Sequence, residues 1–172
     1  MERVQCSGRL TNRLRRTPPA PLNSGVSQLV MLSRFPKISY SDLSARQKEN
    51  YNFQKVSALL AEHGFATIRL SDDWNGADFI AQHLSGETLK VQLKERLTFC
   101  SRYQERDLWM TFPHSNGWYL YPHDALLAQV NEINSFTTSQ SWLASGEYSW
   151  PSIPSKLLST LEPYFLQGIG VG

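Results

Sequence analysis

The sequence has few cysteines and no long apolar run, and each shortage excludes a class of protein. Its 172 residues include only two cysteines, Cys6 and Cys100, which lie far apart and match no metal-ligand spacing. A disulfide framework is therefore excluded, and free thiols in a reducing compartment indicate a cytoplasmic protein. Since no apolar run approaches the roughly 20 residues that a membrane helix needs, we expect a soluble protein without membrane partners.

Several metal and nucleophile motifs are also absent. The four histidines form no HExxH pattern or close pair for zinc, and neither a P-loop nor a GxSxG motif occurs. A calcium loop begun at Asp73 would place Asp78 where glycine is needed and Leu84 where glutamate is needed, so it is excluded. Cys100 with His114 would suggest a thiol nucleophile, but a buried, inert cysteine is far commoner.

Acidic residues are scarce at the N-terminus. Before Met31 the only acid is Glu2, against five arginines at positions 3, 9, 13, 15 and 16. The segment TPPAP at 17–21 and the lack of a hydrophobic period predict that residues 1–37 form a disordered basic arm. Three interpretations stay open: a nucleic-acid tether acting through phosphate charge, an organelle transit peptide, or an N-terminus without a role of its own.

Residues 38–172 have the pattern of a single mixed α/β domain. Apolar spacing predicts a helix over 43–63, with Ser41 or Asp42 as its cap and Gly64 as its end. Strands are expected at 65–70, 77–83, 88–97, 108–112 and 118–121, with a loop at 71–76. Helices are expected from Asp124 and over 155–166. The order of helix, strands and helix predicts a central sheet flanked by helices.

The stretch GADFIAQHLSGETLKVQLK, residues 76–94, reads as a hairpin with one polar face. Side chains alternate along a strand, so Leu89 and Val91 point away from Gln92 and Lys94. Asp78 lies 14 residues before Gln92, which lets the hairpin fold it back beside Gln92. We therefore expect Asp78, Gln92 and Lys94 to gather on one side of the sheet.

Such a cluster has a chemical use. A carboxylate and an amide oxygen are hard ligands suited to Mg²⁺, and the carbonyl of Leu93 would add a third oxygen. A cation there would polarise a phosphoryl oxygen, and a lysine would steady the charge that grows on the phosphate. The alternative is a solvent-facing sheet whose Asp–Lys pair contributes less than about 1 kcal/mol.

These residues resemble the motif of the PD-(D/E)XK nuclease superfamily, which includes restriction enzymes, Holliday-junction resolvases and repair nucleases. In that pattern an acid opens one strand, and an acidic or amide residue, any residue and lysine follow on the next. Ala77-Asp78 stands where the family has Pro-Asp, and Gln92-Leu93-Lys94 stands for the triplet. The resemblance covers about residues 41–130, including WYLYPHDALL, and implies a restriction-endonuclease-like mixed central sheet flanked by helices.

The resemblance also implies a function. Asp78, Gln92 and Lys94 would be the catalytic set of an endonuclease that hydrolyses DNA phosphodiester bonds. Asp78 and Gln92 would hold Mg²⁺, or Mn²⁺, and Lys94 would assist the attacking water. A homodimer is compatible with this, because many relatives cut two strands as dimers. The alternative is a catalytically inactive nucleic-acid-binding or protein-interaction module on the same fold.

Further residues are candidates for supporting roles. Many family members carry a glutamate on the first helix, and the acids available for such a role here are Glu49, Glu62 and Asp73. A basic flank with interleaved aromatic residues would bind nucleic acid through His83, Arg96, Arg102 and Arg106. Acids at 95, 105 and 107 dilute that charge, so a mixed-charge surface loop is the equal alternative. Trp118, Tyr119 and Tyr121 are expected in the core.

Overall fold

The computed structural model describes residues 34–168, and it divides the chain into two units between Ser39 and Tyr40. Most of the expected basic arm, residues 1–33, lies outside the described residues, so that expectation stays a prediction. All the helices and strands treated below belong to the second unit. Among the residues described, no helix is long and apolar enough to cross a membrane.

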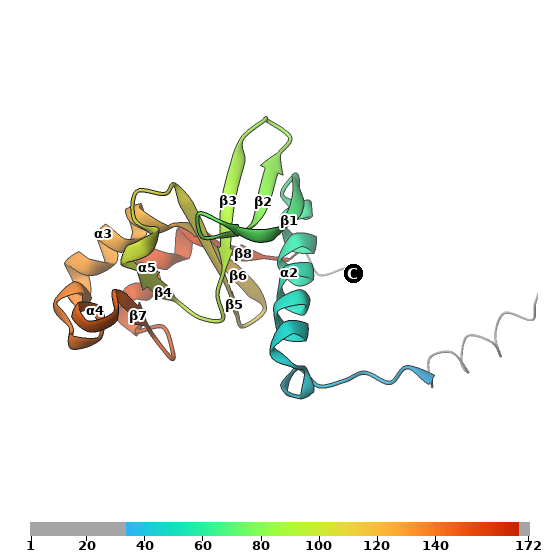
Figure 1. Cartoon of the computed structure of the whole chain (residues 1–172), viewed down its shortest axis with the longest axis horizontal. Helices are drawn as coiled ribbons and strands as arrows, with labels where there is room; N and C mark the ends of the chain where they lie inside the picture. The colour runs from blue at the N-terminus through green and yellow to red at the C-terminus, as the bar shows by residue number, and fades with distance from the viewer. Residues whose placement is uncertain (1–33, 169–172) are drawn as a thin grey trace, which may run out of the picture. The chain divides into compact units, whose positions relative to one another are not determined.

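The second unit is built on a six-stranded mixed sheet in the order β1-β2-β3-β5-β6-β8 (Figure 1). Strands β3 and β5 are parallel, and the other neighbours pair antiparallel. A second sheet pairs β4 with β7. The strands are β1 (Phe65–Trp74), β2 (Ala77–His83), β3 (Thr88–Leu93), β4 (Thr98–Cys100), β5 (Leu108–His114), β6 (Gly117–Pro122), β7 (Glu147–Ser149) and β8 (Phe165–Gln167).

Helix α2 begins two residues later than its sequence signals predict. Its N-cap is Ser44, whose side chain accepts from the backbone N–H of Gln47 while the Gln47 side chain accepts from the Ser44 N–H. This capping box satisfies two helix-end donors, which neither Ser41 nor Asp42 would do. The α-helices are α2 (Ala45–Glu62), α3 (His123–Asn134), α4 (Gln140–Ser145) and α5 (Leu158–Leu161).

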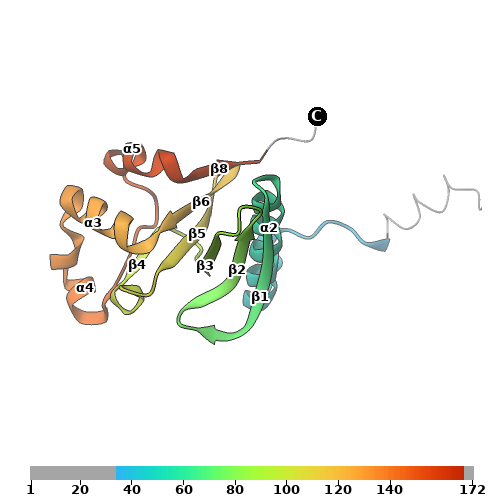
Figure 2. The same ribbon diagram turned by 90° about the horizontal axis from the view of Figure 1, so that it is seen from above.

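Helices cover the sheet on both faces, as Figure 2 shows with α2 on one side and α3 and α4 on the other. On one face Val56 and Leu60 of α2 pack against Phe79 and Val91. On the other face a larger aromatic-rich cluster includes Phe112. Burying each such side chain stabilises the fold by about 1.5–3 kcal/mol. The mixed α/β class is confirmed, and the residues expected in the core, Trp118, Tyr119 and Tyr121, are all buried.

The expected loop at 71–76 is wrong, because β1 continues to Trp74. Its pairing with β2 shifts between Arg69 and Trp74, and the turn is confined to Asn75 and Gly76. The strand lies at the edge of the sheet, where polar side chains face solvent without cost. Because residues 71–73 are a serine and two aspartates, a search for alternating apolar residues does not recognise this part of the chain as a strand.

The expected helix over 155–166 is also wrong. The chain instead forms two 3₁₀ turns, Ser155–Leu157 and Glu162–Tyr164, around the short α5. Pro163 lacks a backbone donor and interrupts any longer helix. Phe165–Gln167 then pairs with β6 as β8. Likewise β3 ends at Leu93 rather than residue 97, and 98–100 form the separate strand β4.

Candidate active site

The hairpin of β2 and β3 places Asp78 directly beside Gln92. The register that pairs Phe79 with Val91 brings these two residues opposite each other when continued by one step. Asp78 Oδ2 accepts a hydrogen bond from Gln92 Nε2 at 2.6 Å and another from the Leu93 N–H at 2.8 Å. The carboxylate is therefore fixed from two directions at the start of β2.

The Gln92 amide presents its donor end to this site. Besides Asp78, Nε2 donates to the carbonyl of Leu93 at 3.2 Å. Both partners are acceptors, so the NH₂ group, and not the amide oxygen, makes these hydrogen bonds. One nitrogen thus contacts two oxygens, which means that Asp78 Oδ2 and Leu93 O converge on a common point.

Converging hard oxygens are the donor chemistry that Mg²⁺ prefers. In the described part of the chain, no group of three His, Cys, Asp or Glu side chains is placed to hold a metal ion. The residues present therefore fit one hard cation through Asp78 and the Leu93 carbonyl. Gln92 joins that set only if its amide turns to present its oxygen.

Lys94 lies next to this pair and is held by an aromatic ring. Its backbone N–H donates to the Thr111 carbonyl at 2.8 Å, which prolongs the contact between β3 and β5. Its Nζ lies 5.3 Å from the centre of the Tyr103 ring. Among the described side chains, no carboxylate forms an ion pair with Nζ within 4.0 Å. The ammonium therefore stays available to a ligand.

Tyr103 is a site residue that the sequence did not reveal. Besides Lys94, it carries the Arg102 guanidinium 4.8 Å from its ring centre, and its hydroxyl accepts from Arg102 at 2.9 Å. Gly76 has a φ of +95°, and a Cβ there would lie 2.8 Å from the Tyr103 ring. Because Gly76 has no Cβ, the buried Tyr103 ring can pack against the residue that precedes β2. The same ring also contacts Lys94 and Arg102.

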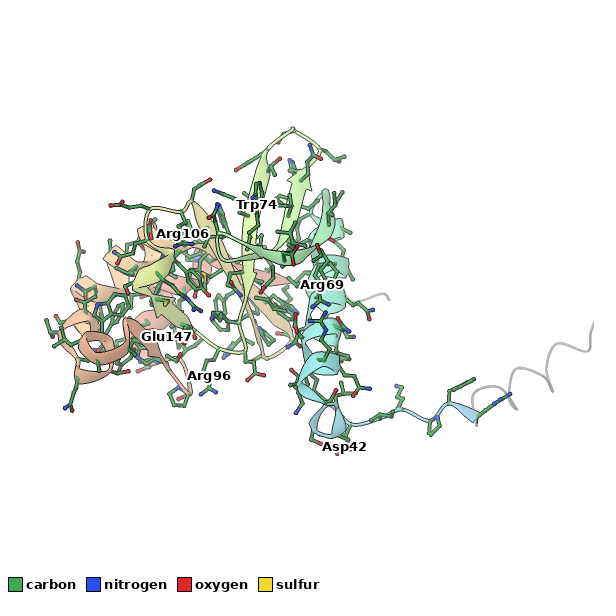
Figure 3. The ribbon with its side chains drawn as sticks, in the orientation of Figure 1. Asp42, Arg69, Trp74, Arg96, Arg106 and Glu147 are labelled. Carbon is green, nitrogen blue, oxygen red and sulfur yellow. The ribbon has the colours of Figure 1, made fainter. Side chains whose placement is uncertain are left out.

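Of the three supporting acids, the structure brings Glu49 to the site. Glu49 and Asp78 line the same cavity of about 140 Å³. The Glu49 carboxylate pairs with Arg69 and lies 3.3 Å from Arg46 (Figure 3 shows Arg69 against α2). Arg69 could not be recognised from the sequence, because its place beside α2 depends on the register of β1. Glu49 therefore lies at the site, but its carboxylate is already paired with two arginines.

Of the other two acids, Glu62 is not brought to the site. Glu62 lies 13 positions further along α2 than Glu49, which is about 20 Å along the helix axis. Asp73 belongs to β1, but its side chain is outside what the structure describes.

The four residues expected to bind nucleic acid are dispersed. His83 is five residues from Asp78 on β2 and on its opposite face, where Nδ1 contacts Ser85 at 2.8 Å. Arg96 follows β3 and Arg106 precedes β5, so they lie at opposite ends of the parallel pair, and Figure 3 shows them apart. Only Arg102 reaches the site, through Tyr103. The basic flank is thus not one surface.

The thiol is buried and unsuited to nucleophilic chemistry. Cys100 is in the core, and its N–H donates to Nε2 of His123 at 3.2 Å. His123 contacts Asp124 at 2.6 Å through its other ring nitrogen. Burial lowers the pKa of His123, so the neutral ring serves as a structural acceptor.

The environment of Asp78 predicts a pH effect on stability. Burial raises the pKa of Asp78 above its ordinary 3.8, against the hydrogen bond from Leu93, and the Glu49 charge raises it further. Between the two pKa values the folded protein binds more protons than the unfolded chain, so the free energy of unfolding falls as pH rises. Asp78→Asn should flatten this part of the profile and stabilise the metal-free protein at neutral pH. Urea unfolding in EDTA at a series of pH values measures both effects; identical slopes for the two proteins would contradict them.

Comparison with known proteins gives likeness in fold. No family model matches the sequence, and no curated protein is significantly similar to it. Solved structures similar to this chain include two nucleases. One is Hjc, a Holliday junction resolvase from Archaeoglobus fulgidus, with 16% identity and a TM-score of 0.32 over 40% of this chain and 74% of that one. The other is the bacterial homing endonuclease I-Ssp6803I, with 14% identity and a TM-score of 0.42 over 71% and 86%.

Both of these proteins are nucleases by name, and the likeness to them is weak in sequence and in structure. At TM-scores below 0.5 the likeness carries no argument about activity or substrate. A function for this chain therefore has to be argued from its own residues.

Proposed function

We propose that this protein is a metal-dependent endonuclease that hydrolyses phosphodiester bonds of DNA. The observation that carries the proposal is the convergence of Asp78 Oδ2 and Leu93 O on one point, with the Lys94 ammonium on the next residue. A half-buried carboxylate that is influenced by the charge of a lysine without an ion-pair partner among the described residues is uncommon on a purely structural sheet surface.

One divalent cation, Mg²⁺ or Mn²⁺, would be held by Asp78, the Leu93 carbonyl and the turned Gln92 amide, and would act as a Lewis acid on a phosphoryl oxygen. Asp78 is already fixed by the Leu93 N–H, so it needs little rearrangement. Lys94 is held over Tyr103 and would orient a water molecule or offset the negative charge of the phosphate. Strands support such a set more rigidly than loops.

Incubation of the purified protein with plasmid DNA tests the proposal. We expect nicking or linearisation with Mg²⁺ or Mn²⁺ and none in EDTA, because the site holds too little positive charge of its own. Asp78→Asn removes the anionic ligand and should abolish cleavage. Cleavage that persists in EDTA, or that survives Asp78→Asn, would refute the assignment.

A second candidate is a catalytically inactive nucleic-acid-binding or protein-interaction module. It is favoured by the pairing of Glu49 with Arg46 and Arg69, and by the Gln92 NH₂ group at the point where a cation would bind. A gel shift with plasmid fragments and no cleavage in Mg²⁺ or Mn²⁺ would support this alternative.

A further inference from the structure

An open groove of about 630 Å³ lies beside the candidate site. One wall comes from α2 and the turn before it, and the other from the end of β5 and the start of β6. Its lining includes three aromatic and two basic side chains, Tyr40, Tyr51, Trp118, Lys48 and Lys55, among polar and small residues. None of the nucleic-acid contacts expected from the sequence lies in it, so it is a separate surface.

The groove is connected to the candidate site. Asn52 and Glu95 line both the groove and a neighbouring cavity of about 180 Å³, which Lys94 and Glu49 also line. Glu49 in turn lines the cavity that contains Asp78. Three neighbouring cavities that share lining residues therefore extend from Asp78 along the first turns of α2 to the groove.

Aromatic rings and ammonium groups lie side by side in the groove. The rings of Tyr40 and Tyr51 lie 5.3 Å apart, and both side chains are about two-fifths exposed. Lys48 Nζ is 5.6 Å from the Tyr40 ring, and Lys55 Nζ is 5.5 Å from the Tyr51 ring. Proteins that bind single-stranded nucleic acid use this combination, because bases stack on the rings while cations follow the phosphates.

The rings are held in place before any ligand binds. The buried Asn52 side chain donates to the Tyr40 hydroxyl at 2.9 Å, so α2 itself orients that ring. Trp118 is 8% exposed and forms part of the groove floor. Rings fixed in this way lose little conformational freedom on binding. Glu95 is the one acid among the lining residues, against two lysines, so the charge favours an anionic strand.

We infer that this groove binds unpaired nucleotides of a DNA strand whose backbone continues to Asp78. In a duplex the base faces are stacked inside and cannot contact Tyr40 or Tyr51, so only an unpaired segment uses the rings. The inference rests on the proposed function for its link to cleavage. It assigns the enzyme a preference for DNA with a single-stranded extension or branch next to the duplex.

Binding measured in EDTA tests the groove separately from catalysis. Fluorescence anisotropy compares the full-length protein on a blunt duplex with the same duplex carrying a short thymidine overhang. We expect about tenfold tighter binding to the overhang duplex, which is the scale of stacking one base on an aromatic ring. Tyr51→Leu should remove this preference and Tyr51→Phe should keep it, because phenylalanine retains the ring.

Lys55→Glu and Lys156→Glu form a matched pair of charge reversals. Lys156 is exposed on the 3₁₀ turn Ser155–Leu157, contacts the Ile133 carbonyl and does not line the groove, so only the Lys55 change should weaken overhang binding. Equal affinity for both duplexes, or an overhang preference that Tyr51→Leu leaves intact, would overturn the inference. A preference for the overhang duplex without any Mg²⁺-dependent cleavage would instead refute the proposed endonuclease activity. It would still support the binding of unpaired nucleotides in the groove.

Discussion

Lys94→Ala should reduce Mg²⁺-dependent plasmid cleavage by about 10²–10³-fold while leaving the protein folded. Removing one preorganised group that stabilises transition-state charge typically costs a factor of this size. The fold should tolerate the change, because among the described residues the ammonium contacts the Tyr103 ring and forms no ion pair. That contact is worth about 0.5–1 kcal/mol. Initial rates of supercoil loss, with thermal unfolding measured alongside, check both statements.

Lys156→Ala is the matched control for this substitution. It removes an ammonium that bonds to the Ile133 carbonyl, far along the chain from β3, and should cleave at the wild-type rate. Lys94→Arg keeps the positive charge but replaces the compact ammonium with a planar group, so partial activity is expected. Cleavage by Lys94→Ala at the wild-type rate would show that Lys94 has no role in catalysis. If Lys94→Ala does not fold, the cleavage rate of Lys94→Arg tests the role instead.

The hairpin was predictable because its signals are local. Period-two alternation set the faces of β2 and β3, and the turn between them fixed the register, so the contact between Asp78 and Gln92 followed from spacing. The same alternation puts Phe79 and Val91 in the core, on the face away from Asp78 and Gln92. These elements are neighbours along the chain, and no knowledge of the distant sheet order is needed to pair them.

The surroundings of the hairpin were not predictable in this way. Tyr103 reaches Lys94 from the 3₁₀ turn Ser101–Tyr103, and Arg69 meets Glu49 because the register of β1 places it beside α2. The basic residues after Lys94 were grouped by their closeness in sequence. Their separation follows from the parallel pairing of β3 with β5, which places Arg96 and Arg106 at opposite ends.

The orientation of the Gln92 amide shows the limit of reading a motif by residue type. The sequence suggested an oxygen ligand, yet an amide has a donor end as well, and here two acceptors face it. The chain thus satisfies Asp78 and the Leu93 carbonyl internally. Any cation that binds there has to displace these two hydrogen bonds, so metal binding is opposed by the protein's own contacts.

Gln92→Glu should therefore raise the metal affinity of the site. The glutamate cannot donate to Asp78 or to the Leu93 carbonyl, and its charge repels Asp78, so the protein should be less stable than wild type in EDTA. A divalent cation between two carboxylates relieves that repulsion, and each added ligand charge tightens binding. We expect Mg²⁺ and Mn²⁺ to bind about tenfold tighter, with a larger rise in melting temperature than in the wild type. Isothermal titration calorimetry and thermal unfolding with and without metal measure these effects.

Gln82→Glu supplies the matched control, because Gln82 is exposed on the same strand as Asp78 and adds the same charge four residues away. It should leave stability in EDTA and metal affinity unchanged, since no carboxylate lies opposite it in the register. If Gln92→Glu behaves like Gln82→Glu in both measurements, the two oxygens do not form a cation site. If it binds metal tightly but still fails to cleave plasmid, Asp78 and the Leu93 carbonyl hold a cation without supporting hydrolysis. One substitution would then separate the metal binding of the proposed function from its catalysis.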